Sequence, residues 1–261
     1  MTSARVFFFG GLISYRALFG WLSPWVFIPT LVIAPIFQIL LFVYIGRSAR
    51  LGSDEFYVIG NAIQYASIPC LFAMTQTIAG ERYQQTLPFI LITPAKRLPL
   101  FLGRALPVVA NGSLVAALAL VLGGSIVGVD LPASTWAQVA LAAVVSAASC
   151  TGLGLVNAAC GFLARNTAVF SNIVFGILLV STGANVPLHE LPGWLSTMAQ
   201  GLPMTHGIEA TRRLAGGAGL ADVAGLLAAE AVVGLAYGAA GYALIRALER
   251  QSRRHATLER A

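Results

Sequence analysis

The chain has 261 residues, of which 57% are hydrophobic and 10% are charged, and its mean hydropathy is +0.80. Soluble domains carry about 25% charged residues, so this composition excludes an ordinary soluble globular domain and predicts a protein whose outer face is solvated by lipid. The net charge of +6 does not indicate nucleic-acid binding, because the basic residues sit at the ends of long apolar runs, where membrane proteins carry them.

The first segment, residues 6–22, is rich in aromatic side chains and contains Arg16. A charged side chain in the middle of a bilayer is costly, so we expect an N-terminal interfacial helix with its rings toward the lipid. The alternative is that this segment extends the first membrane span. A cleavable signal peptide is not predicted, because Arg16 interrupts the apolar run before any small-residue cleavage site.

Six apolar stretches follow, and each is long enough for the roughly 20 residues that a membrane-spanning helix needs. They cover residues 24–45, 56–79, 106–127, 136–163, 168–186 and 221–247. The sequence therefore predicts an all-α, polytopic membrane protein with six transmembrane helices in a single domain, residues 1–261.

Six spans place both termini on the same side of the membrane, and the basic residues indicate which side. With cytoplasmic termini, twelve Lys and Arg residues fall inside and four outside, in agreement with the positive-inside rule. The inside set is Arg5, Arg16, Arg82, Lys96, Arg97, Arg104, Arg165, Arg246, Arg250, Arg253, Arg254 and Arg260, and the outside set is Arg47, Arg50, Arg212 and Arg213. The excess of arginine over lysine is typical of GC-rich bacterial coding, so we expect the inner membrane of a bacterium.

The connection between the second and third spans, residues 81–104, is long and basic. It begins with Glu81 and Arg82, and a short apolar helix is predicted at about residues 87–92, with Thr86 as its cap. A short helix with one apolar face at the cytoplasmic surface is what the groove of a partner protein binds. The alternative is a plain interfacial loop.

The connection between the fifth and sixth spans is too polar to cross a membrane and too apolar for an ordinary loop. Pro187, Pro192 and Pro203 divide it into short pieces. Trp194 and Met198 are spaced to share one face of a helix. Residues 187–213 are therefore predicted to form short helices that enter the outer leaflet without crossing it.

These two connections resemble those of the type-2 family of ABC transporter permeases, the six-span exporter subunits. The first carries that family's Glu-Arg, Thr-Leu and Thr-Pro pattern, and the second its Leu-Pro-x-Trp, Pro and Ala-x-Arg pattern. The matching residues are Glu81, Arg82, Thr86, Leu87, Thr93 and Pro94, then Leu191, Pro192, Trp194, Pro203, Ala210 and Arg212. Span number and order resemble the family over the whole chain.

The resemblance implies a cytoplasmic coupling helix at residues 87–93, in which Phe89 and Leu91 supply apolar side chains. That helix would dock on a cytosolic ABC ATPase subunit. The expected assembly has two ATPases and two permeases, the second being a copy of this chain or a homologue, around a pathway formed mainly by spans one, two and five. This chain lacks a P-loop, so ATP and Mg would be bound by the partner subunit. We expect no cofactor, metal site, nucleic-acid partner or enzymatic activity in the chain itself.

Polar side chains inside the spans are candidates for lining the pathway or for hydrogen bonds between helices. They include Asn61 and Gln64 in the second span, Asn172 in the fifth and Glu230 in the sixth. We hypothesise that Glu230 stabilises the packing of the sixth span. The alternative is a glutamate near the outer interface, either neutral or hydrogen-bonded to a neighbouring helix.

Small residues also carry a packing signal. Two Gly-x-x-x-Gly pairs put small residues on one face of a helix, which lets helices approach closely. The pairs are Gly124 with Gly128 and Gly234 with Gly238. Both pairs are therefore predicted to lie at helix–helix contacts.

The sequence thus predicts the membrane subunit of an ATP-driven exporter for a hydrophobic or amphipathic substrate, such as a drug, an antibiotic or a lipid-like compound. A polysaccharide or lipid-linked glycan exporter is the alternative within the family. An ATPase-independent channel or secondary carrier, or an intramembrane enzyme, is the alternative outside it. The chain shows no internal repeat of the kind on which many carriers are built, and no catalytic constellation stands out.

Overall fold

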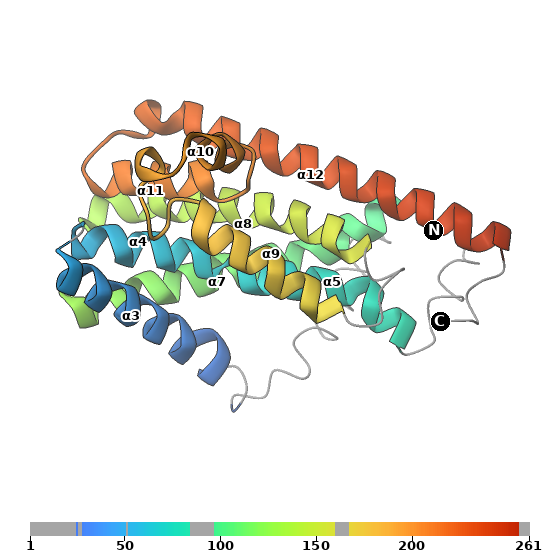
Figure 1. Ribbon diagram of the computed structural model, residues 1–261, viewed down its shortest axis with the longest axis horizontal. Coiled ribbons are helices and arrows are strands. Elements are labelled where there is room, and N and C mark those ends of the chain that lie inside the picture. The colour runs from blue at the N-terminus through green and yellow to red at the C-terminus, as the bar shows by residue number, and fades with distance from the viewer. Residues whose placement is uncertain (1–24, 26–27, 51, 84–96, 160–166, 256–261) are drawn as a thin grey trace.

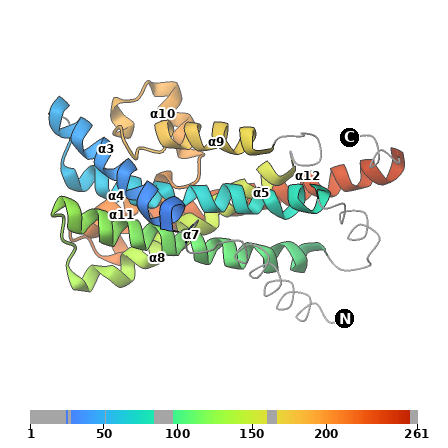
Figure 2. The ribbon, with the colours of Figure 1, turned by 90° about the horizontal axis from the view of Figure 1, so that it is seen from below.

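The computed structural model describes residues 25, 28–50, 52–83, 97–159 and 167–255. These residues form a bundle of long helices, seen from two directions in Figures 1 and 2. In chain order the elements are η1 (Ile28–Ile33), α3 (Ala34–Ala49), α4 (Asp54–Tyr65), α5 (Ser67–Tyr83), α7 (Arg97–Val127), η2 (Ala133–Thr135), α8 (Trp136–Ala159), α9 (Thr167–Ser181), η4 (Leu188–Glu190), α10 (Gly193–Gln200), α11 (Thr205–Ala215) and α12 (Leu220–His255).

The bundle has two ends, a distal end and a proximal end. At the distal end, the connections 50–53, 128–132 and 216–219 join α3 to α4, α7 to η2 and α8, and α11 to α12 (Figure 1). At the proximal end, α5 finishes, α7 begins, and α8 and α12 run toward their C-termini (Figure 2). A separate apolar cluster fills each end, with Tyr57, Leu214 and Val223 in the distal one and Met74, Phe101 and Ile245 in the proximal one.

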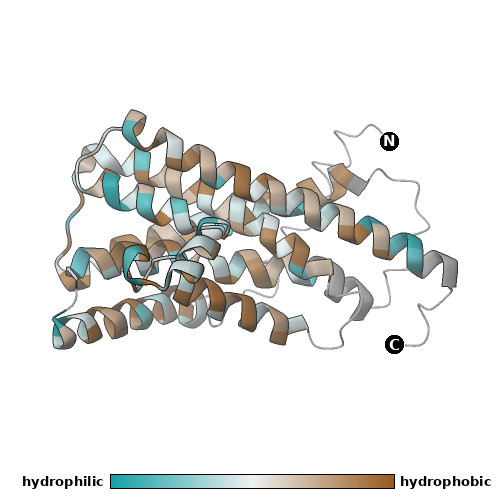
Figure 3. Ribbon diagram, turned by 45° about the horizontal axis from the view of Figure 1, so that its top comes forward, coloured by the Kyte–Doolittle hydropathy of each residue, from teal (hydrophilic) through white to brown (hydrophobic). Residues whose placement is uncertain are grey.

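The prediction of an all-helical membrane protein is confirmed for the part of the chain that the structure describes. Five helical stretches are long and apolar enough to cross a membrane, namely residues 28–49, 54–76, 98–127, 133–159 and 220–251. Their exposed surface is rich in large apolar side chains, with hydrophilic residues toward the helix ends (Figure 3). The predicted interfacial helix at residues 6–22 lies outside the described residues.

The predicted fifth span is shorter than expected. Residues 168–186 were predicted to be helical, but α9 ends at Ser181 and has 15 residues. At 1.5 Å per residue it is about 22 Å long, against a hydrocarbon core of about 30 Å. The residues just before it, 160–166, lie outside the described part of the chain. The six-span topology therefore stays a prediction.

The second predicted span is divided into two helices rather than continuous. The α4 helix ends at Tyr65, and α5 begins at Ser67. Pro69 explains the break, because it has no N–H to donate to the carbonyl of Tyr65 and its ring crowds that carbonyl. The amide of Ala66 bonds instead to the carbonyl oxygen of Ile63, at 3.2 Å, and tightens the turn.

Two other boundaries differ from the prediction. The α7 helix begins at Arg97, so residues 97–104 are helical rather than part of a loop. The α12 helix continues to His255, beyond the predicted end at residue 247. In both cases the helix extends past the apolar stretch, because a charged turn at the membrane surface can stay helical where water satisfies its side chains.

The α8 helix is the central element, and it packs on α5, α7, α11 and α12. Its contact with α12 is made by the second predicted glycine pair. A Cβ on Gly234 would lie 2.5 Å from the Cα of Ser149, and one on Gly152 would lie 2.5 Å from the carbonyl oxygen of Gly234. The backbones of α8 and α12 therefore touch, as the Gly234 and Gly238 pattern predicts.

The first glycine pair has a different role, so its prediction as a helix contact is wrong. Gly128 has a φ of +86°, and the amides of Gly128 and Val129 both bond to the carbonyl oxygen of Gly124, at 2.8 and 2.9 Å. This is the glycine-closed end of a helix. The pair terminates α7 at the distal end.

The two glycines of the α12 pair predict different responses to alanine. Gly234→Ala should lower the free energy of unfolding by about 1–3 kcal/mol, because the new methyl group has no room against α8. Gly238→Ala should be neutral or slightly stabilising, because nothing lies within 4 Å of its Cβ position. Denaturation by sodium dodecyl sulfate in mixed micelles measures both, and equal effects would contradict this packing.

Candidate functional site

Two of the residues predicted to couple to an ATPase are among the described residues. Glu81 and Arg82 lie in the last turn of α5. Thr86, Leu87, Phe89, Leu91, Thr93 and Pro94 lie outside the described residues. The two helices that flank them, α5 and α7, pack against each other, and α5 ends and α7 begins at the proximal end (Figure 2).

The segment between α9 and α12 folds into short helices near the distal end. Pro187 and Pro192 immediately precede η4 and α10, where their missing N–H groups cost nothing. Leu191 lies in the extended link between these two helices, and Pro203 lies in the turn between α10 and α11. The exposed side chains of Trp194 and Met198 share one face of α10, as their spacing predicts. Their position in the outer leaflet stays a prediction.

The α11 helix starts against the buried carboxylate of Glu230. The amide of Met204 donates to Oε1 at 2.6 Å, and the amide of Gly207 donates to Oε2 at 3.0 Å. The first amides of a helix have no partner within the helix and carry partial positive charge. Glu230, which comes from α12 and is fully buried, therefore satisfies two donors that no water reaches.

Gly207 is needed for this approach. A Cβ at this position would collide with the hydroxyl of Ser146 on α8. Met204 has a φ of 74°, in the left-handed region, at the residue before the helix. The start of α11 is thus wedged between α8 and α12, and the carboxylate determines how it sits there.

The other end of α11 is held by Arg212. Its guanidinium donates to the carbonyl oxygens of Gly183 at 2.8 Å, Ala184 at 3.0 Å and Phe56 at 3.1 Å, and it lies 3.5 Å from the centre of the Phe56 ring. Burial lowers the pKa of Arg212 to about 10, so the group stays charged at neutral pH. Gly60 leaves room for it, because a Cβ there would lie 2.5 Å from Nη2.

These contacts connect α11 to neighbouring segments at both of its ends. We call the set of Glu230, Met204, Gly207, Arg212 and the carbonyls of Phe56, Gly183 and Ala184 the α11 clamp. It joins α12 at one end of the short helix to α4 and the segment after α9 at the other. The clamp consists of hydrogen bonds between two charged side chains and main-chain groups.

Further hydrogen bonds fasten α4 to the same segment. Asn61 donates to the side chain of Asn185 at 2.8 Å and accepts from Gln38 of α3 at 3.0 Å. Gln64 accepts from the hydroxyl of Thr182 at 2.9 Å. Of the two roles considered for Asn61 and Gln64, these bonds support the one between helices.

Two further polar residues, Asn157 and Asn172, lie in different environments. Asn157 of α8 donates to Thr75 of α5 at 2.9 Å and to Ser171 of α9 at 2.7 Å, all buried. Asn172 is exposed and bonds to the carbonyl of Ala168 in its own helix at 3.0 Å. Asn157 therefore joins three helices, whereas Asn172 lies on the outer face of α9.

Some of these partners were not singled out from the sequence. Gln38, Thr182 and Asn185 are polar residues within or beside apolar stretches, which is the signal that selected Asn61 and Gln64. The carbonyls that Arg212 binds left no signal at all, because every residue has a carbonyl.

Comparison with known proteins identifies a family of membrane proteins. The family model of ABC-2 type transporters matches residues 10–214. No curated protein matches the chain. The matched range contains both connections that resemble the permease family and ends at the last turn of α11, so Glu230 lies beyond it.

The contacts of Glu230 predict a large cost for its removal. Glu230→Ala should lower the free energy of unfolding by about 2–4 kcal/mol, because two buried amides lose a charged acceptor. Glu209→Ala is the matched control, since its carboxylate is exposed and pairs with Arg213, and it should cost less than about 0.5 kcal/mol. Hydrogen exchange should also quicken at Met204 and Gly207. Wild-type stability of Glu230→Ala would contradict the clamp.

Adjacent arginines on α11 allow a second comparison. Arg212→Lys should lower the free energy of unfolding by about 2–3 kcal/mol, because one ammonium cannot reach three carbonyls and stack on Phe56. Arg213→Lys should change it by less than about 0.5 kcal/mol, because Arg213 is exposed and contacts Glu209. Thermal unfolding in dodecyl maltoside micelles distinguishes the two, and equal losses would show that the carbonyl contacts contribute nothing.

Proposed function

The chain belongs to the ABC-2 type transporter family, and we propose that it forms the translocation pathway of an ATP-driven exporter. A permease of this family is a multi-pass membrane protein that associates with an ABC ATPase, and it is not itself a nucleotide-binding domain. The observation that carries the proposal is the family match, since it covers residues 10–214 and includes both characteristic connections.

The proposed ATPase contact is at the proximal end. The α5 and α7 helices flank residues 84–96 there, and those residues carry Thr86, Leu87, Phe89, Leu91, Thr93 and Pro94. We assign residues 87–93 as the coupling helix. Two ATPase subunits would bind ATP and Mg, and their closure would move the coupling helices of two permeases.

The proposed second permease would face α3 and α9. Both helices present large exposed apolar side chains, with Phe37 and Leu41 on α3 and Ile173 and Val180 on α9. The α3 helix and the segment that follows α9 are also joined to α4 by the hydrogen bonds of Asn61 and Gln64. These features support a pathway along spans one, two and five, between two copies of this chain or between it and a homologue.

The proposed location is the inner membrane of a bacterium, with both termini in the cytoplasm. Support comes from the charges of the described residues. The proximal end carries the basic residues Arg97, Arg104, Arg246 and Arg250, and the distal end carries Asp54, Glu55 and Asp130. The positive-inside rule places the first set in the cytoplasm.

The proposed substrate is a hydrophobic or amphipathic compound, such as a drug, an antibiotic or a lipid-like molecule. An apolar chain with short connections suits a compound that enters from the lipid. Multidrug resistance would follow from export of drugs. A polysaccharide or lipid-linked glycan is the alternative substrate class, and compounds that stimulate ATP hydrolysis would distinguish the two.

The coupling helix yields a direct test. The tagged chain, purified in detergent from its native host, should bring down an ABC ATPase subunit in about equal amount and hydrolyse ATP. Phe89→Asp with Leu91→Asp should abolish ATP-driven flux in vesicles, because charge on the apolar face prevents docking. Ser134→Asp is the control, since it adds charge at an exposed position at the distal end.

Two results would count against this proposal. A wild-type chain that purifies alone, with flux indifferent to ATP, would favour a channel or secondary carrier. Unchanged ATP-driven flux in the doubly substituted chain would remove residues 87–93 from the coupling step.

A further inference from the structure

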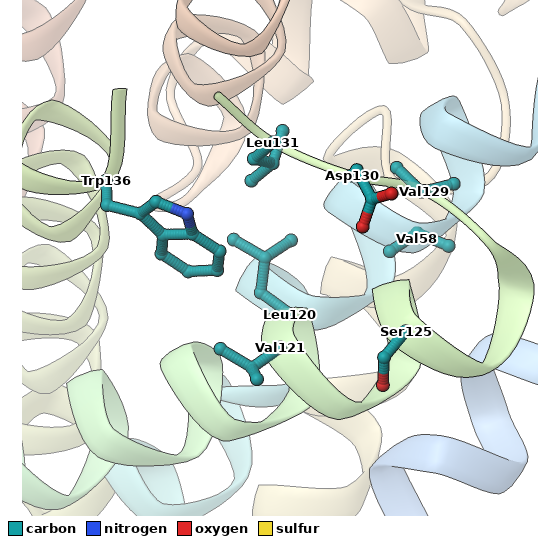
Figure 4. A pocket seen from close by; sticks show the side chains of 8 residues that line it. All are labelled: Val58, Leu120, Val121, Ser125, Val129, Asp130, Leu131 and Trp136. Atoms are coloured by element: carbon teal, nitrogen blue, oxygen red, sulfur yellow. The ribbon is translucent and has the colours of Figure 1, made fainter. Parts of the chain in front are cut away.

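A pocket lies at the distal end, and none of its lining residues belongs to the α11 clamp. It has a volume of about 220 Å³ and is bounded by α4, the C-terminal half of α7, the connection 128–132 and the first residue of α8 (Figure 4). Most of its lining residues are aliphatic, namely Val58, Leu120, Val121, Val129 and Leu131. An apolar cavity with a few polar groups at its edge is the usual form of a small-molecule site.

The main chain around the pocket is held firmly. Gly128, at the end of α7, turns the chain so that residues 129–131 run along the pocket. The hydroxyl of Thr135 donates to the carbonyl of Pro132 at 2.7 Å, and its amide donates to the same oxygen at 2.9 Å. The two hydrogen bonds fix the approach to α8, which begins at Trp136.

The lining of this pocket includes a carboxylate and an indole ring. In Figure 4, Asp130 and Trp136 lie on opposite sides, with Leu120 between them. Asp130 is exposed and makes no hydrogen bond or ion pair with the described residues. Ser125, the other polar residue of the lining, donates its hydroxyl to the carbonyl of Leu122, so it does not offset the charge of Asp130.

Three basic side chains at this end are engaged elsewhere. Arg47 pairs with Asp54 at 2.6 Å, Arg213 pairs with Glu209 at 2.9 Å, and Arg212 is held in the α11 clamp. Arg50, in the connection after α3, forms no ion pair with Asp130. The negative charge of Asp130 therefore has no direct partner among the described residues, and it lies at the edge of an apolar cavity.

We propose that this pocket binds an alkylammonium group carried on an apolar body, with the cation at Asp130 and the apolar body against Leu120 and Trp136. Carboxylates attract such cations, and aliphatic and aromatic side chains are the usual lining for an apolar body. Trp136 begins a membrane-crossing helix, at the depth where tryptophan meets lipid headgroups. The occupant is thus either the amine headgroup of a phospholipid or a free organic cation, and the site is separate from the exposed face of α3 and α9.

Trp136 itself supplies the measurement. In a chain with Trp21, Trp25 and Trp194 changed to Phe, its fluorescence is recorded in dodecyl maltoside micelles during titration with benzyltrimethylammonium. A saturable change is expected, and benzyl alcohol, which lacks the cation, should give a non-saturating response. The titration needs neither ATP nor transport, so its outcome is independent of the exporter proposal.

Substitutions test the contribution of the charge and that of the cavity separately. Asp130→Asn should weaken the affinity for benzyltrimethylammonium about fivefold, the loss of one exposed charge contact of about 1 kcal/mol. Val121→Phe should abolish saturation by filling the pocket. Glu190→Gln removes an exposed carboxylate remote from the pocket and should change nothing. The affinity of a variant is compared with that of the parent chain only where the two proteins have the same unfolding temperature.

The source of the cation is distinguished in nanodiscs with a constant fraction of phosphatidylglycerol. The remaining lipid is either phosphatidylethanolamine or the uncharged diglucosyldiacylglycerol. If the occupant is a headgroup, phosphatidylethanolamine competes with the probe and should raise its apparent Kd severalfold. An unchanged Kd assigns the site to a free organic cation. A response that does not saturate, or that is the same in Asp130→Asn and the parent chain, would overturn the proposal.

Discussion

The start of α11 sets the constraint on which the distal half of the molecule depends. A helix of 11 residues begins among buried side chains, where no water can bind its first amides. Lipid offers no substitute, so a backbone donor in such a place must find a partner in the protein. Glu230 supplies it from α12, which fixes that long helix relative to α11, and Gly207 permits the approach.

The opposite end of α11 solves the complementary problem. The chain leaves α9 at Ser181 and stays non-helical through Pro187, which leaves carbonyl groups without helical donors. Arg212 donates to two of them and to Phe56, while Thr182 and Asn185 bond to Gln64 and Asn61. A single short helix therefore locates α4, α9 and α12 together. Movement of any one of them at the distal end must move the others or break charge-assisted hydrogen bonds.

Local patterns in the sequence predicted much of this fold, and long-range contacts escaped them. Apolar length located the five long helical stretches, α12 among them, and Pro187 and Pro192 mark the positions just before two short helices. Pro69 was visible, yet the break at Ala66 was missed because apolarity continues across it. Glu230 is identified as a candidate from the sequence because an ionisable side chain inside a membrane span is energetically costly. Its partners are amides 23 and 26 residues away, and no sequence pattern marks an amide as unpaired. The two glycine pairs look alike in sequence, but one lies inside a helix and the other closes one.

The charged residues at the distal end differ in how far they are buried and in the groups to which they bond. Glu230 is buried and Arg212 is partly buried, and each bonds to main-chain groups, so they stabilise the protein without needing each other. Arg47 with Asp54 and Arg213 with Glu209 form exposed pairs, which contribute little to stability. Asp130 belongs to neither group. It is exposed, so water lowers the cost of its charge, and it makes no bond to the described residues that would be lost when a ligand arrives. A carboxylate in that condition can bind a cation without disturbing the fold, which the carboxylate of Glu230 cannot do.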